Sequence, residues 1–178
     1  MKPSDFGYKL ANNICFFHKG PLSNWYGAYK GQNGGFRFGG NNFNCIEQWM
    51  MFQKALVFDD TESAELIIAE KNPKTQKQLG RGVKNYDDSL WAECRFEIVK
   101  MGITKKFQAN EAEREFLLGF HPHTIFCEAA PWDKIWGNGL SIDDPKALEV
   151  KNWSGANLLG RIISEVRWNY YLDSLRKK

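Results

Sequence analysis

Apolar residues recur at helical spacing along much of this chain, and this periodicity limits the folds that it can adopt. Between residues 45 and 58, Ile46, Met50 and Val57 fall on one stripe of a helix. The last helical segment, expected to begin near Ala156, has a broader apolar face, which consists of Leu159, Ile162, Ile163, Val166 and Tyr170. The pattern therefore predicts a core built mainly from helices.

Polar caps and glycines mark the ends of these helices. Asn44 precedes the first of them and is placed to cap it. Asn110 and Glu113 have the spacing of a capping box, so we expect a helix to begin after Asn110. Gly102 and Gly119 are predicted to end the helices before them, because glycine is a weak helix former. Further helices are predicted over residues 60–69, 73–79 and 88–101.

Strand signals are few and short. The apolar run at residues 14–17 and the segment at residues 124–127 each predict a short strand. Phe36 and Phe38 flank an arginine in a glycine-rich stretch, which is typical of a β-hairpin. With 178 residues, the chain is long enough for one hydrophobic core. We therefore predict a single compact α+β domain over residues 1–178, predominantly helical with a small sheet or hairpin.

The composition argues against several classes of protein. Apolar residues make up 43% and charged residues 25% of the chain, which is ordinary for a soluble globular protein. The net charge of +3 is small for a protein that holds duplex DNA through its phosphates. No run of about 20 apolar residues is present, and Met1–Leu10 lacks the apolar stretch of a secretion signal. The expected location is intracellular, cytoplasmic or nuclear, with no membrane contact.

The potential metal ligands form no recognisable motif. Cys15, Cys45, Cys94 and Cys127 contain no C-x-x-C pair, so neither a zinc framework nor a disulfide framework is indicated. The His-Pro-His sequence at residues 121–123 has no accompanying acidic or sulfur ligand pattern. The glycines spell neither a P-loop nor a dinucleotide-binding fingerprint. We therefore predict no metal and no cofactor.

Glu47 and Lys54 are the first candidates for chemistry. They share one edge of the helix at residues 45–58 with Met51, and they lie two turns apart, roughly 10 Å. If this edge faces a pocket, burial lowers the pKa of the lysine and makes its amine a usable nucleophile. The alternative is a solvated helix edge on which neither residue has a chemical role.

Three further segments carry candidate binding residues. The loop at residues 129–141 holds Asp133 between two tryptophans, with glycines that permit close backbone approach. The amides that open the final helix, around Asn157, can hold a phosphate. Trp91 and Arg95 lie one helical turn apart and can offer a stacking ring and a cation. Each segment also has a structural interpretation: a tight turn, a cap or brace made by the asparagine, and an arginine packed over a tryptophan.

Five segments occur in a fixed order along the chain, and two of them are distinctive. These two are E-x-W-M-M-x-x-K-A at residues 47–55 and W-G-N-G-L at residues 136–140. Together they resemble the successive motifs of the NADAR/YbiA-like superfamily, and the resemblance covers about residues 15–172. The full set of matching segments is residues 21–26, 47–55, Trp91 with Arg95, 131–141 and 153–160.

This resemblance implies a fold and an activity. Proteins of the superfamily are similar in being compact, largely helical α+β proteins that cleave N-glycosidic bonds of phosphorylated ribose without a metal. One branch releases ribose phosphate from intermediates of riboflavin synthesis, and another removes ADP-ribose from modified guanine in nucleic acid. Trp49-Met50-Met51 and the W-G-N-G-L-S sequence resemble the second branch more closely. The expected substrate is therefore ADP-ribose on a guanine of DNA or RNA.

The resemblance also implies roles for individual residues. Lys54 would attack the anomeric carbon and form a Schiff base that water resolves, while Glu47 and Asp133 would move protons or stabilise the developing cation. Trp91 and Trp136 would stack on the substrate or line its site. The remaining substrate-binding residues that it implies are Ser23, Asn24, Trp25, Arg95, Gly137, Asn138, Gly139 and Asn157.

Other functions are compatible with the same residues. A damage-control N-glycosidase acting on riboflavin intermediates would share the catalytic residues. A non-catalytic module that binds ADP-ribose or NAD would keep the tryptophan and glycine loop but would not need Glu47 with Lys54. A helical interaction protein would use all its aromatic residues as core, and replacing Lys54 would then change no ligand behaviour.

Overall fold

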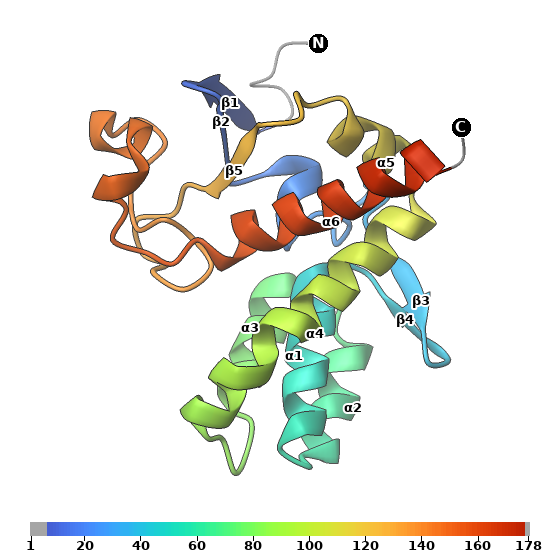
Figure 1. Ribbon diagram of the computed structural model, residues 1–178. Coiled ribbons are helices and arrows are strands. Elements are labelled where there is room, and N and C mark those ends of the chain that lie inside the picture. Colours follow the sequence, from blue (N-terminus) through green and yellow to red (C-terminus); the bar gives the residue numbers. More distant parts are fainter. Residues whose placement is uncertain (1–6, 177–178) are drawn as a thin grey trace. The chain divides into compact units, whose positions relative to one another are not determined.

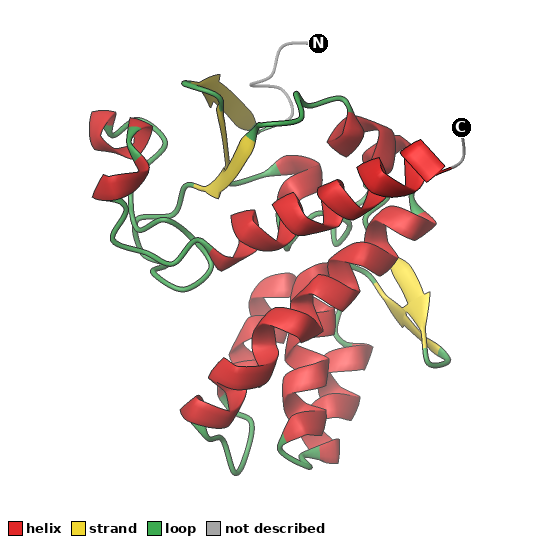
Figure 2. Cartoon of the chain, viewed as in Figure 1, coloured by secondary structure: helices red, strands yellow, loops and turns green. Residues whose placement is uncertain are grey.

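The computed structural model describes residues 7–176, and helices dominate it (Figures 1 and 2). The chain forms two compact units: Asn24–Arg114 is one, and the segments before and after it form the other. Each unit combines helices with a few short strands, so the predicted α+β class with mainly helical content is confirmed. A single domain over residues 1–178 stays a prediction.

The unit formed by Asn24–Arg114 is built around helix α1. This helix contacts the other three helices of the unit, and a two-stranded antiparallel hairpin lies against the longest of them (Figure 1). The predicted hairpin and the helices predicted before residue 88 are confirmed. The elements are β3 (Phe36–Phe38), β4 (Asn41–Phe43), α1 (Ile46–Val57), α2 (Thr61–Ala69), α3 (Pro73–Arg81) and α4 (Asp88–Ala109).

Helix α4 runs through Gly102, so the predicted helix end at this glycine is wrong. The glycine has a packing role instead. Trp49 of α1 is 1% exposed, and its indole Nε1 donates a hydrogen bond to the carbonyl of Ile98 at 2.8 Å. A Cβ atom at position 102 would overlap the Trp49 indole, so the two helices approach closely only because no side chain is present there.

Replacing this glycine is expected to destabilise the fold. We expect Gly102→Ala to lower the free energy of unfolding by about 1–3 kcal/mol, because the added methyl overpacks a core that is already filled by Trp49. The matched control is Gly82→Ala, where the nearest atom would lie 3.4 Å from the new Cβ atom. Chemical denaturation of both variants measures the difference. Equal stabilities would contradict the packing role of Gly102.

The caps of the helices differ in part from the prediction. Asn44 does not cap α1: its side-chain amide donates to the carbonyl of Lys71 at 2.7 Å, and Cys45 takes the cap position without a side-chain hydrogen bond. Asp60, by contrast, caps α2 by accepting from the amide of Ser63. The asparagine therefore ties the start of α1 to the segment that precedes α3.

The second unit contains a three-stranded sheet in the order β1, β2, β5. Strand β2 pairs antiparallel with β1 and parallel with β5, and all four of its residues are buried. Helix α6 packs on β5, and the division between the units falls within α5. Among residues 7–176, no helix is both long and apolar enough to cross a membrane. The elements are β1 (Tyr8–Ala11), β2 (Ile14–Phe17), α5 (Glu111–Leu118), β5 (Ile125–Glu128) and α6 (Leu158–Arg176).

Two features of this unit were not predicted from the sequence. Strand β1 is one, and a turn at Asn12 and Asn13, with φ angles of 48° and 61°, joins it to β2. The start of the final helix is the other. It begins at Leu158 rather than near Ala156, because Asn157 has a φ angle of 50°, which lies outside the helical region.

Candidate active site

Helix α1 buries both of its candidate catalytic residues. Glu47 is 2% exposed and Lys54 is 8% exposed, although charged side chains are rarely buried to this extent. This edge of the helix is therefore buried rather than solvated, and the chemical roles of the two residues stay predictions. Glu47 lies in the first turn of α1 and Lys54 in its last turn, as their spacing predicts.

Glu47 lies in a cluster with two other predicted residues, Asn24 and Trp25. Its carboxylate accepts a hydrogen bond from the Trp25 indole Nε1 at 3.2 Å, and its backbone amide donates to the carbonyl of Asn24 at 3.0 Å. Asn24 is 6% exposed, and its side-chain oxygen is buried with no hydrogen-bond partner among residues 7–176. The structure thus joins the segment that precedes the hairpin to the start of α1.

Lys54 occupies a different neighbourhood, at the other end of α1. Its amine donates to the carbonyl of Gly80 at 2.8 Å and lies 3.9 Å from the centre of the Tyr86 ring. Burial lowers the pKa of Lys54; the nearby negative charge of Asp88 opposes this shift, and the positive charge of Arg81 adds to it. A lower pKa raises the fraction of neutral amine, which is the nucleophilic form.

Tyr86 contacts several residues around Lys54. No sequence motif identified it as a residue of the candidate site. Its hydroxyl donates to the Asp88 carboxylate at 2.6 Å, and its ring packs edge-on against Phe58. Desolvation and the hydrogen bond to Asp88 raise the pKa of Tyr86 to about 12, so the phenol is neutral at physiological pH. Its ring is therefore a neutral surface that supports the Lys54 amine.

Trp91 and Arg95 lie one turn apart on α4, which follows Tyr86 in the sequence. Trp91 is 6% exposed. The positive charge of Arg95 opposes the rise in the pKa of Tyr86. Its Nε atom is buried and has no hydrogen-bond partner in the described part of the chain. Arg95 thus retains an unused donor.

The loop that carries Asp133 belongs to the other unit. One carboxylate oxygen of Asp133 accepts hydrogen bonds from the backbone amides of Ile135 at 3.0 Å and Trp136 at 2.8 Å. The acid therefore shapes its own loop, as the structural interpretation of this segment predicts. Trp136 is partly buried, whereas Trp132 is 82% exposed.

The glycines and the asparagine at residues 137–139 are fixed tightly within this loop. Asn138 is fully buried, and its backbone amide donates to the carbonyl of Glu128 at 2.9 Å. Its side-chain nitrogen is buried without a hydrogen-bond partner among the residues described. Gly139 has a φ angle of 76°, and a Cβ atom there would overlap the Ser154 hydroxyl, so only glycine fits. Gly137 is similarly enclosed, by Ala130 and Asp133.

The start of α6 does not offer free amides to a phosphate, so this sequence-based hypothesis is wrong. The amides of residues 156–159 donate to the carbonyls of residues 134–137. Asn157 braces β5 instead: its side chain accepts from the amide of Glu128 at 3.0 Å and donates to the carbonyl of Phe126 at 2.9 Å. The bracing alternative for this asparagine is therefore confirmed.

Ser23 is the last of the predicted residues. It follows the short 3₁₀ helix η2 (Gly20–Leu22), and its amide donates to the carbonyl of Gly20 at 3.0 Å. By internal contacts it belongs to the unit that carries Asp133, whereas Asn24 begins the unit that carries Glu47.

Among residues 7–176, no three His, Cys, Asp or Glu side chains gather as a metal site would require.

The arrangement of these elements defines a class of protein with an α+β fold of the YbiA type. The NMR structure of the E. coli protein YbiA superposes with a TM-score of 0.73, covering 98% of this chain and 96% of YbiA at 20% sequence identity. The sequence pattern of the NADAR domain matches residues 15–170. The chain therefore belongs to the NADAR domain family, as its motifs predict.

Two curated relatives are similar in sequence. Protein irg-1 of Caenorhabditis elegans is 37% identical over 127 residues, which is 70% of this chain and 59% of irg-1. N-glycosidase R617 of Acanthamoeba polyphaga mimivirus is 37% identical over 121 residues, which is 68% of this chain and 71% of the viral protein. The chain thus matches less than two thirds of the length of the worm protein.

Proposed function

We propose that this protein is an N-glycosidase that hydrolyses the bond between a phosphorylated ribose and a nitrogen, and that it removes ADP-ribose from guanine in nucleic acid. The burial of Lys54 is the observation that carries this proposal. A buried amine with a lowered pKa, supported by the Gly80 carbonyl and the Tyr86 ring, suits a nucleophile. The viral relative, which is named an N-glycosidase, supports the reaction type.

Buried polar atoms without hydrogen-bond partners support the proposed substrate-binding residues. Asn24, Arg95 and Asn138 each keep one buried side-chain atom without a hydrogen-bond partner in the described part of the chain. Such an atom costs about 1–3 kcal/mol, so folded proteins rarely retain one without a reason. All three residues were predicted from the sequence to bind substrate. A phosphate oxygen would satisfy a donor such as that of Arg95, and a sugar hydroxyl would satisfy the Asn24 oxygen.

The reaction begins at the anomeric carbon of the ribose. The neutral amine of Lys54 forms a bond to this carbon while the bond to the guanine nitrogen breaks, and guanine leaves with the electron pair and takes up a proton. A proton then passes from the attached amine to the ring oxygen as the nitrogen electron pair displaces the bond between this oxygen and the anomeric carbon, and the opened sugar is held as a protonated Schiff base. Water adds to its carbon, the amine departs, and ADP-ribose is released. The net reaction consumes one water molecule.

Glu47 and Asp133 are the proposed proton carriers. A fixed carboxylate stabilises positive charge that appears on the sugar only in the transition state, so it lowers the barrier without tightening substrate binding. Glu47 is buried and held by the Trp25 indole, which fixes its orientation. One carboxylate oxygen of Asp133 accepts two backbone hydrogen bonds within its own loop.

A comparison of substrates tests the proposed function. Oligonucleotides that carry ADP-ribosylated guanine and pyrimidine ribose phosphates of riboflavin synthesis are incubated with the protein side by side. We expect turnover of the oligonucleotide and little of the pyrimidine compounds. The reverse preference would favour the riboflavin branch, and tight binding of ADP-ribose without turnover of either substrate would favour a binding module.

The lowered pKa of Lys54 predicts a pH dependence of the rate. The protonated amine cannot attack, so kcat/KM rises with pH through the pKa of Lys54, and the midpoint of this rise lies below 10.5, the ordinary value for lysine. Because Asp88 raises the pKa of Lys54, Asp88→Asn is expected to move this rise to lower pH. Steady-state rates across the pH range measure both effects. A rise centred at or above 10.5 would contradict the buried-amine nucleophile.

A further inference from the structure

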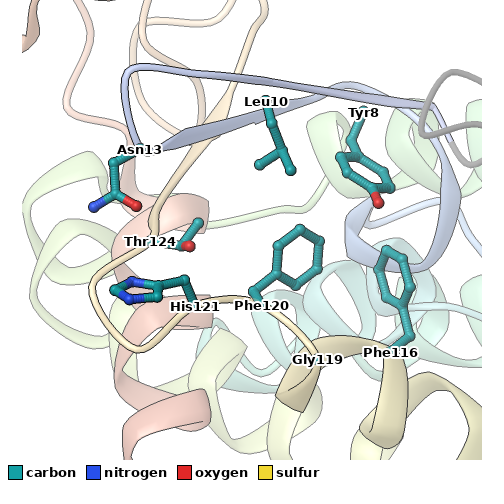
Figure 3. Close-up of a pocket in the computed structure, with 8 residues that line it drawn as sticks. All are labelled: Tyr8, Leu10, Asn13, Phe116, Gly119, Phe120, His121 and Thr124. Carbon is teal, nitrogen blue, oxygen red and sulfur yellow. The ribbon is translucent and has the colours of Figure 1, made fainter.

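A pocket of about 450 Å³ lies in the unit that contains β1, and none of the residues given a catalytic or substrate-binding role above lines it. Its walls come from β1, the turn that follows β1, the end of α5 and the loop between α5 and β5 (Figure 3). The volume falls within the range of roughly 300–1,000 Å³ that is typical of small-molecule sites. Neither the sequence motifs nor the proposed reaction assigns it a role.

One half of the pocket is aromatic. Tyr8 lies edge-on to Phe116 and Phe120, with ring centres 5.6 Å and 5.3 Å apart, and the two phenylalanines are 5.2 Å from each other. Leu10 extends from β1 toward these rings and is 53% exposed (Figure 3). This half therefore offers an apolar surface with ring edges and faces, which suits a flat ring.

The other half is polar and carries both donors and acceptors. Asn13, His121 and Thr124 lie together at this end (Figure 3). The Asn13 side-chain nitrogen donates to the carbonyl of His123 at 2.6 Å, so its oxygen remains an acceptor for a ligand. The His121 Nδ1 accepts from the amide of His123 at 3.4 Å, and in the neutral ring this leaves Nε2 as a donor. The Thr124 hydroxyl can both donate and accept a hydrogen bond.

Charge narrows the class of ligand. Among residues 7–176, those that line the pocket include no lysine, arginine, aspartate or glutamate. None of these side chains carries a permanent charge, so a phosphate or another strongly charged group would lose its hydration without a permanent opposite charge to compensate. The lining therefore suits a neutral group that combines a flat apolar body with a polar edge.

The walls of the pocket are fixed before any ligand binds. The Arg167 guanidinium of α6 donates to the carbonyls of Leu117 at 3.2 Å, Pro122 at 3.1 Å and Phe120, and so holds the loop that leaves α5. On the opposite side, the Asn13 carbonyl accepts from the amide of Ile125 at 3.0 Å, which ties the turn after β1 to β5. A preformed site binds with a smaller loss of conformational entropy.

We propose that this pocket binds a neutral heteroaromatic ring of the nucleobase class. The aromatic half contacts the faces and edges of the base, and the polar half hydrogen-bonds to its mixed donor and acceptor edge. A base within a single strand and a free nucleoside share this chemistry. The proposal is independent of Lys54, because none of the residues that form the pocket takes part in the proposed hydrolysis.

Titrations observed by NMR test this site in the full-length protein. Adenosine, guanosine, cytidine, uridine and a short single-stranded oligonucleotide are the probes, and benzyl alcohol is a ring without a base edge. We expect the nucleosides to perturb the resonances of Leu10 and Thr124. Benzyl alcohol should bind about tenfold more weakly, because its single hydroxyl replaces only part of the hydrogen bonds that a base edge forms with the polar half. Tighter binding of the oligonucleotide than of nucleosides identifies a base in a strand as the ligand, and equal binding identifies the nucleoside.

Two variants and one control accompany the titrations. Leu10→Trp fills the pocket from an exposed position, and His121→Ala removes a donor from the polar half. We expect each to weaken nucleoside binding, the first by about tenfold or more, the scale of one lost base-stacking contact. Leu66→Trp changes a leucine of α2 that is 52% exposed and outside the pocket, and it should leave binding unchanged. The proposal is overturned if no nucleobase perturbs the pocket, if benzyl alcohol binds as well as the nucleosides, or if all three variants bind alike.

Discussion

The Lys54→Met variant is expected to lose turnover by about 10³-fold or more, which is the scale of removing a nucleophile. Methionine fills most of the space of the lysine stem but cannot form a Schiff base. The buried stem of Lys54 therefore stays packed, while the amine near Gly80 and Tyr86 is removed. Initial rates of ADP-ribose release, measured beside a thermal unfolding curve, separate lost chemistry from lost folding.

A matched substitution controls for the loss of a positive charge. Lys74 lies on α3, is exposed, and makes no contribution to the proposed site. Lys74→Met should retain full activity. If Lys54→Met folds and is equally active, Lys54 is not the nucleophile, and the proposed Schiff-base chemistry fails with it.

The Glu47→Gln variant is expected to show the second largest effect, a decrease in kcat of about 10²–10⁴-fold. The amide is nearly isosteric with the acid, and its oxygen can still accept from the Trp25 indole. It cannot carry a negative charge, so it no longer transfers a proton or stabilises a cation. We expect the free energy of unfolding to change by less than about 1 kcal/mol, because the packing is kept. Kinetics and denaturation of the same sample measure both quantities.

The control for Glu47→Gln is Glu65→Gln, on the exposed face of α2. This variant should match the wild type in both rate and stability. A Glu47→Gln protein with unchanged kcat would remove Glu47 from the reaction. A protein that instead loses most of its stability would indicate a structural role for the buried acid.

Local patterns predicted most of the fold, and the errors have physical causes. Helical periodicity located α1 and α6, because a helix with an apolar stripe is stable when that face packs against the core. Strand β1 was missed because its residues are only partly buried and do not alternate cleanly. The length of α4 was missed because Gly102 is retained for its contact with Trp49, a partner far away in the sequence.

The spacing of residues along the chain predicted the geometry of the candidate site only where these residues share one helix. Glu47 and Lys54 lie on one edge of α1, so their spacing alone predicted a common orientation. Gly80 contacts Lys54 from α3 and Tyr86 from the segment between α3 and α4, while Asp88 acts on it from the start of α4. No local pattern encodes such contacts. The unused polar atoms of Asn24, Arg95 and Asn138 likewise depend on tertiary packing.

Borohydride trapping tests the central claim most directly. The protein is mixed with an oligonucleotide that carries ADP-ribosylated guanine, sodium borohydride is added during turnover, and the digested protein is analysed by mass spectrometry. Reduction converts a Schiff base into a stable secondary amine, so we predict a peptide in which Lys54 carries the opened sugar, and no such adduct in Lys54→Met. Turnover of the substrate with no adduct on Lys54, or with the adduct on another lysine, would contradict the account.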